Sequence, residues 1–153
     1  LYAPNFEKFW AEEVAPDYSE YRTKAIELLG REAKLLEIVR LVGMESLSNE
    51  ERLVIEVSRM LREDFLFQDA FSPDDAYTPL DRQYGMLKSM MTFYEAGLPV
   101  VTQEEFDFTK FPKISSYAVV PTLKDKLDWT KDDFAKFQDT VRSEITSLVA
   151  NAA

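Results

Sequence analysis

The chain has 153 residues, about the size of one ordinary domain, and a formal net charge of -10. It contains no cysteine and no histidine, which excludes disulfides, thiol nucleophiles, the commonest metal ligand and any Ser-His-Asp mechanism. The acidic balance argues against nucleic acid or an anionic membrane surface as a partner, because both attract basic faces. No apolar stretch approaches the roughly 20 residues that span a bilayer, so direct membrane insertion is not expected.

Two helices are predicted in the first third of the chain. Residues 5–15 favour a short helix, and residues 17–42 a long one that Gly43 can end with a left-handed backbone conformation. The face of the first helix consists of Phe6, Phe9, Trp10 and Val14. The stripe of the second consists of Tyr21, Ala25, Leu28, Leu29, Leu35, Leu36, Val39 and Val42. Glu32 interrupts that stripe, and Gly30 weakens the helix.

The next helix has a local start signal. Ser48 and Glu51 have the S-x-x-E spacing of a capping box, in which two orphan backbone N–H groups are satisfied reciprocally. Apolar residues then follow at intervals of four: Leu53, Val57, Leu61 and Phe65. The helix is predicted to run to about Phe67, and residues 68–77, rich in Asp and containing Pro73, to form a loop.

A further helix is predicted from Thr78, which is a good N-cap before a proline, to the breakers Gly97 and Pro99. Its apolar face consists of Leu80, Tyr84, Leu87, Met91 and Tyr94. Residues 98–128 show no steady period, and the YAVV stretch within them favours either a short strand or an extended segment.

The last helix begins at Thr130, with Asp133 three residues later, and one face of it carries Phe134, Phe137, Val141, Ile145 and Leu148. The sequence therefore predicts an all-α protein. We expect a helical bundle of about five helices with an irregular, proline-interrupted connector before the last helix. Residues 1–153 form one domain in this interpretation, with a helical core over about 5–97 and a variable tail over 98–153.

The chain lacks the motifs of a self-contained enzyme. Its four glycines cannot make a phosphate-binding loop or a dinucleotide fingerprint. Adjacent carboxylates such as Glu50 with Glu51 and Glu104 with Glu105 are interpreted as solvated surface, because charged residues mostly stay exposed. We therefore expect no catalytic residue and no metal site in this chain.

Residues 35–71 resemble a known family. The segments EIVRLVG, RMLREDFL, QDAF and MLKSMMTFYE, together with the earlier FWAEEVAPDYSEYRTKAIELL, are similar to the C-terminal helical region of the catalytic A subunit of archaeal A-type and vacuolar-type rotary ATP synthases. The resemblance extends over roughly residues 5–97. The noncatalytic subunit of the same complexes shares this architecture, but the LREDFLFQDAF segment favours the catalytic one.

The resemblance implies a mechanical role for the GMESLSNEE turn. In related subunits the equivalent acidic helix-loop-helix pushes on the central stalk. The implied stalk-contact residues are Met44, Glu45, Ser46, Leu47 and Glu50. Without the resemblance, the same spacing favours a capped turn with two locally packed apolar residues.

The resemblance also implies a nucleotide-side role for the loop after Phe67. It assigns Phe71, with Gln68 beside it, to the adenine side of the catalytic site in the intact subunit. An aromatic face can stack on a base with roughly 1–3 kcal/mol. Family relatives have a polar residue where Phe67 stands, and this difference leaves the outer edge of the pocket undefined.

The decisive chemistry would lie outside this chain. The resemblance implies a preceding nucleotide-binding domain that binds ATP or ADP with magnesium, and a place on the cytoplasmic face of a membrane. The implied partners are the B subunits of a hexameric ring and the subunit of the central stalk. The chain is then a piece of a longer subunit that couples ATP synthesis or hydrolysis to proton or sodium transport. The alternative is a stand-alone acidic helical interaction module that binds a partner through Phe6, Phe9 and Trp10.

Overall fold

The computed structural model describes residues 17–66 and 80–150. Within these two stretches the backbone forms helices and turns and no β-strand, so the prediction of an all-α bundle is confirmed. The helix predicted over 5–15 and the loop predicted over 68–77 lie outside the described residues, as does the cap predicted at Thr78.

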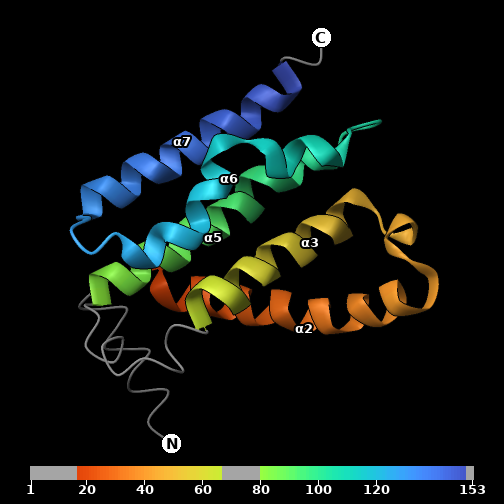
Figure 1. Cartoon of the computed structure of the whole chain (residues 1–153), viewed down its shortest axis with the longest axis horizontal. Helices are drawn as coiled ribbons and strands as arrows, with labels where there is room; N and C mark the ends of the chain where they lie inside the picture. Colours follow the sequence, from red (N-terminus) through yellow and green to blue (C-terminus); the bar gives the residue numbers. More distant parts are fainter. Residues whose placement is uncertain (1–16, 67–79, 151–153) are drawn as a thin grey trace, which may run out of the picture.

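The described helices form a hairpin followed by a second group of helices (Figure 1). The elements are α2 (Tyr18–Val42), the 3-10 turn η1 (Met44–Ser46), α3 (Asn49–Met60), the π-helical turn η2 (Leu61–Leu66), α5 (Leu80–Val101), the 3-10 segment η4 (Phe108–Lys113), α6 (Ser115–Val119), the 3-10 segment η5 (Val120–Asp125) and α7 (Lys131–Ala150). Helices α2 and α3 run antiparallel and η1 closes them at one end, while α7 lies along α5 on the far side (Figure 1).

The centre of the core lies where α5 meets the segments around it. Phe93 of α5 is fully buried, and its ring lies 6.3 Å from Phe111 of η4, 6.0 Å from Tyr117 of α6 and 6.5 Å from Phe137 of α7, measured between ring centroids. Edge-to-face and tilted arrangements at these distances add to the free energy gained by burying the rings. Helix α5 is therefore the element on which the other helices assemble.

The predicted capping box at Ser48 is confirmed, and the predicted helix start at Thr130 has the same reciprocal pair of hydrogen bonds. The Ser48 hydroxyl accepts a hydrogen bond from the Glu51 backbone N–H at 3.2 Å, and the Ser48 N–H donates to the Glu51 carboxylate at 2.8 Å. The Thr130 N–H donates to Asp133 at 2.8 Å, and the Thr130 hydroxyl accepts from the Asp133 N–H at 3.3 Å. The backbone hydrogen bond from Thr130 lowers the pKa of Asp133 from its ordinary value.

Two predictions about the second half of the chain are wrong. Helix α5 does not end at Gly97 but continues through Pro99 to Val101. A Cβ on Gly97 would lie 3.0 Å from Phe111 and 3.2 Å from Leu53, so this glycine permits close packing instead of ending the helix. Pro99 lies in the last turn, where its missing N–H removes one hydrogen bond only.

The connector over 98–128 is more helical than its sequence indicates. The YAVV stretch is neither a strand nor extended, because Tyr117, Ala118 and Val119 belong to α6 and Val120 begins η5. Three short helical segments therefore occupy the region in which prolines prevent a long one.

Helix α2 is attached to the bundle mainly from Tyr18 to Leu35. Its buried side chains end at Leu35, and Val39 is only partly buried against the core. Leu36 and Val42, which the sequence pattern assigned to the buried stripe, are 43% and 63% exposed. Gly43 ends the helix with φ 92° and ψ 166°, so the positive φ is confirmed, although the ψ is extended and not left-handed helical.

Two glycines in helices should respond to alanine in opposite directions. A Cβ at Gly85 would lie 2.6 Å from the Phe134 ring, so Gly85→Ala should lower the free energy of unfolding by about 1–3 kcal/mol through overpacking. Gly30 is exposed and has nothing within 4 Å of the added Cβ, so Gly30→Ala should raise it by about 0.5–1 kcal/mol. Urea unfolding of the two variants measures both, and equal effects would contradict the packing of α7 on Gly85.

Candidate functional site

The end of the α2–α3 hairpin carries a concentration of exposed apolar side chains. We call residues 36–47 the hairpin tip; they comprise the last turns of α2, η1 and Leu47. Five of the seven exposed large apolar side chains among the described residues belong to it: Leu36, Ile38, Leu41, Val42 and Met44. Leu41 is the most exposed, at 79%. Scattered apolar side chains are normal on a surface, but a cluster of this kind indicates an interaction site.

The tip is acidic but carries little unpaired charge. Glu37 pairs with Arg40 one helical turn away, and Glu50 lies 3.2 Å from Arg31 of α2. Among the residues that the structure describes, Glu45 is exposed and has no ion-pair partner. The tip therefore presents apolar surface together with one free carboxylate.

Local hydrogen bonds hold η1 in a fixed shape. The Ser46 hydroxyl donates to the Gly43 carbonyl at 2.8 Å, and the Arg52 guanidinium donates to the Met44 carbonyl at 3.3 Å. The Asn49 side-chain amide donates to the carbonyls of Val101 at 3.1 Å and Phe106 at 2.9 Å. This amide ties the start of α3 to the end of α5, so the tip is anchored to the bundle through α3.

The structure places the predicted stalk-contact residues differently from one another. Met44, Glu45 and Ser46 are exposed on η1. Glu50 is half-buried and paired with Arg31. Leu47 is 7% exposed and belongs to the core, so its stalk contact stays a prediction that this burial does not support. Its burial agrees with the alternative of a locally packed apolar residue in a capped turn.

Sequence reasoning missed most of the apolar surface at the tip. Ile38 and Leu41 lie off the buried stripe of α2, and this departure was the available signal. Leu36 and Val42 lie at the edges of the stripe, where helical spacing cannot tell a buried side chain from an exposed one. The structure settles the point: α3 and η1 pack against α2, but Leu36 and Val42 stay exposed.

Other proposed sites lie outside the described residues. Gln68 and Phe71, assigned to the adenine side, and the apolar face of Phe6, Phe9 and Trp10 belong to segments that the structure does not describe. Within residues 17–66 and 80–150, no group of three or more acidic side chains is placed to hold a metal ion. No helix in these stretches combines the length and the apolar character needed to cross a bilayer.

Comparison with known proteins places this bundle in a family. Residues 7–109 match the family model described as the C-terminal domain of V and A type ATP synthase. That match includes α2, the hairpin tip, α3 and α5. The chain therefore belongs to the family of V- and A-type ATP synthase C-terminal domains.

Individual relatives match over nearly the whole chain, and each is the A subunit of an A-type ATP synthase. The relative from Methanopyrus kandleri is 50% identical over 160 residues, which is 100% of this chain and 26% of that protein. The relative from Staphylothermus marinus is 36% identical over 154 residues, or 99% of this chain and 26% of the relative. A relative from Methanospirillum hungatei is 43% identical over 97% of this chain and 25% of its own length. The chain spans about a quarter of the length of these relatives.

Two neighbouring apolar residues of the tip should differ sharply when truncated. Leu47→Ala should lower the free energy of unfolding by about 2 kcal/mol or more, because it leaves a cavity under η1. Met44→Ala should change it by less than about 0.5 kcal/mol, because Met44 is 41% exposed. Chemical denaturation measures both. A large loss at Met44, or none at Leu47, would contradict the division of the tip into a buried and an exposed part.

Proposed function

We propose that this chain is the helical C-terminal domain of the catalytic subunit of an A-type rotary ATP synthase, and that its hairpin tip contacts the rotating central stalk. The observation that carries the proposal is the cluster of exposed apolar side chains at the end of a stiff hairpin. The family match and the relatives from A-type ATP synthases support the assignment to this complex.

The hairpin has the length and the attachment of a lever. Helix α2 has 25 residues and is therefore about 37 Å long at 1.5 Å per residue. It is packed in the bundle from Tyr18 to Leu35, and its last turns extend beyond this last buried side chain. Packed helices move as units, so a displacement of the bundle is carried to the tip.

The chemistry of the tip suits a surface that moves past it. Apolar contacts are non-directional, so Leu41, Val42 and Met44 can touch successive faces of a stalk helix without a fixed register. The free carboxylate of Glu45 and the overall negative charge attract basic stalk residues at longer range. A surface with many directional hydrogen bonds would hold the stalk in one orientation.

The rest of the proposed assembly follows from this placement. The nucleotide domain of the intact subunit would bind ATP or ADP with magnesium, and B subunits would alternate with it in the ring. Gln68 and Phe71 stay a prediction for the adenine side of that site. The head would lie on the cytoplasmic face of a membrane and couple ATP turnover to ion transport. This chain would contribute force transmission and no catalytic group.

Removing the exposed apolar tip should uncouple the motor without unfolding the domain. In the assembled complex, Leu41→Ser, Val42→Ser and Met44→Ser together should lower the torque and the ratio of ions transported to ATP hydrolysed. Nucleotide affinity should stay the same, because none of these three residues belongs to the segment proposed for the adenine side. The loss of apolar contact of about 1–3 kcal/mol should weaken binding of the stalk subunit to the ring by roughly 5-fold to 150-fold.

The matched control is Leu127→Ser. Leu127 is 78% exposed, like Leu41, but it belongs to the segment between η5 and α7, at the opposite end of the bundle from η1 (Figure 1). This variant should leave torque, ion transport and stalk binding unchanged. Normal coupling in the triple variant would remove the stalk-contact assignment, and equal losses in both variants would show a general effect of added polarity.

A further inference from the structure

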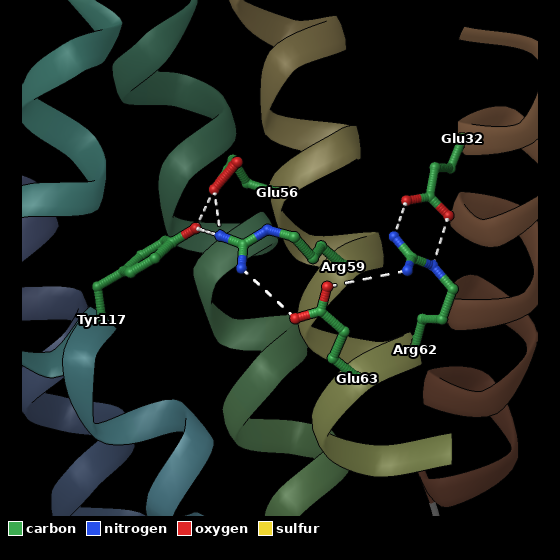
Figure 2. A network of polar contacts seen from close by, with 6 residues as sticks. All are labelled: Glu32, Glu56, Arg59, Arg62, Glu63 and Tyr117. Carbon is green, nitrogen blue, oxygen red and sulfur yellow. Dashed lines mark hydrogen bonds and ion pairs between the residues drawn. The ribbon is translucent and has the colours of Figure 1, made fainter. Parts of the chain in front are cut away.

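A continuous line of polar side chains crosses the domain from α2 to α6 (Figure 2). We call this set the strut. Its members are Glu32 of α2, Glu56 and Arg59 of α3, Arg62 and Glu63 of η2, and Tyr117 of α6. The strut joins three layers of the fold that are far apart in the sequence.

At the α2 end, a buried carboxylate is held by a two-pronged contact. Glu32 is 5% exposed, and the Arg62 guanidinium donates to it from Nη2 at 2.8 Å and from Nε at 3.5 Å. The hydrogen bond to Glu32 raises the pKa of Arg62 above its ordinary value, so the guanidinium stays charged. A buried carboxylate is tolerated only with such a partner, and the fork geometry fixes both its position and its angle.

At the α6 end, three groups share one set of hydrogen bonds. Arg59 Nη2 donates to the Tyr117 hydroxyl at 2.6 Å and to Glu56 Oε1 at 2.8 Å, and the Tyr117 hydroxyl donates to the same Glu56 oxygen. Burial raises the pKa of Tyr117, with the hydrogen bond to Glu56 as the next cause, so the hydroxyl keeps its proton. The triangle fixes α6 against α3 in one register.

Glu63 joins the two ends. Its carboxylate lies 3.7 Å from Arg59 Nη1 through Oε1 and 3.8 Å from Arg62 Nη1 through Oε2. It therefore offsets the repulsion between two guanidinium groups that are three residues apart. Glu63 and Arg62 belong to the π-helical turn η2, and π-helical turns are rare and recur at functional positions.

The strut meets α2 at the point where the packed part of the helix ends. Glu32 is the last charged group of α2 that is buried. It lies one turn before Leu35, and the hairpin tip begins directly after Leu35. The Ser58 hydroxyl donates to the Leu28 carbonyl at 3.1 Å on the same face. A force on the hairpin tip therefore acts on α2 close to Glu32. Apolar packing allows helices to slide past one another, whereas directional charged hydrogen bonds resist sliding.

We propose that the strut is the force-transmitting connection of this domain, and that Glu32, Arg59, Arg62 and Tyr117 are positioning residues that keep the hairpin in register with the α6–α7 layer. This inference rests on the proposed function, because it assumes that the tip bears a load. When one layer moves, the strut then makes the other layer move with it, because the helices do not slide past one another. Its role is to set the register and not to add stability. Glu32 is buried while Arg62 is about half exposed, so the cost of desolvating the carboxylate offsets much of what the ion pair contributes.

The test replaces charge by shape in the assembled complex. Glu32→Met with Arg62→Met should keep the thermal unfolding temperature close to that of the unmodified complex, because two apolar side chains of similar length fill the space. Amide hydrogen exchange over residues 36–42 should become roughly tenfold faster, since charge-assisted hydrogen bonds that oppose opening are lost. Torque and the ratio of ions transported to ATP hydrolysed should fall, while ATP affinity stays the same.

A hydroxyl deletion tests the other end of the strut with a close control. Tyr117→Phe removes the group that joins α6 to Glu56 and Arg59 and should also lower the coupling ratio. Tyr94→Phe removes a hydroxyl from a half-buried tyrosine of α5 that has no hydrogen-bond partner among the described residues, and should leave coupling unchanged.

The outcomes separate the strut from the stalk contact. Unchanged exchange over residues 36–42 in the Met pair would overturn the strut, whatever the stalk does. Suppose that the tip variant lowers the coupling ratio. Faster exchange with a normal coupling ratio in the Met pair would then overturn the role of the strut in force transmission. Normal coupling in the tip variant would contradict the stalk contact and leave the strut to be judged separately. A loss of coupling in the Met pair would then mean that the strut transmits force from a contact other than the hairpin tip.

Discussion

The behaviour of this domain depends on where α2 stops being attached to the bundle. Side chains of α2 are buried up to Leu35, and the Glu32–Arg62 ion pair lies one turn before that limit. Beyond it, α2 contacts the rest mainly through α3 and η1. The last turns of α2 therefore extend beyond the packed part of the helix, and they can carry displacement without contributing much to the core.

The rest of the fold makes that clamp rigid. The aromatic core is centred on Phe93 of α5, and α3 packs between α5 and α2. The Asn49 amide ties the start of α3 to the end of α5 through the Val101 carbonyl and to the following turn through the Phe106 carbonyl. Apolar packing thus supplies the stability, whereas the polar contacts set the register in which the helices meet. The hairpin tip and the Glu32–Arg62 ion pair are thus connected through α2.

The parts of this structure that depend on neighbours in sequence could be predicted from it. The capping boxes at Ser48 and Thr130 were predictable because all their atoms belong to residues three apart. The end of α5 was not, because Gly97 is required by Phe111 and Leu53, which are distant in sequence. Glu32 on an apolar stripe signalled a buried partner, but helical spacing could not identify Arg62. Of the candidate site, the position of the turn was predictable, whereas the burial of Leu47 and the exposure of Leu41 depend on tertiary packing.

Cross-linking from the tip tests the central claim most directly. The chain has no cysteine, so Met44→Cys introduces the only thiol of this domain, and a short bifunctional reagent then reports its neighbour in the assembled complex. We expect a covalent product with the central-stalk subunit from Met44→Cys and none from Leu127→Cys, which is at least as exposed but lies at the other end of the bundle. No stalk product from Met44→Cys, or an equal yield from both positions, would contradict the account of the hairpin as the arm that meets the stalk.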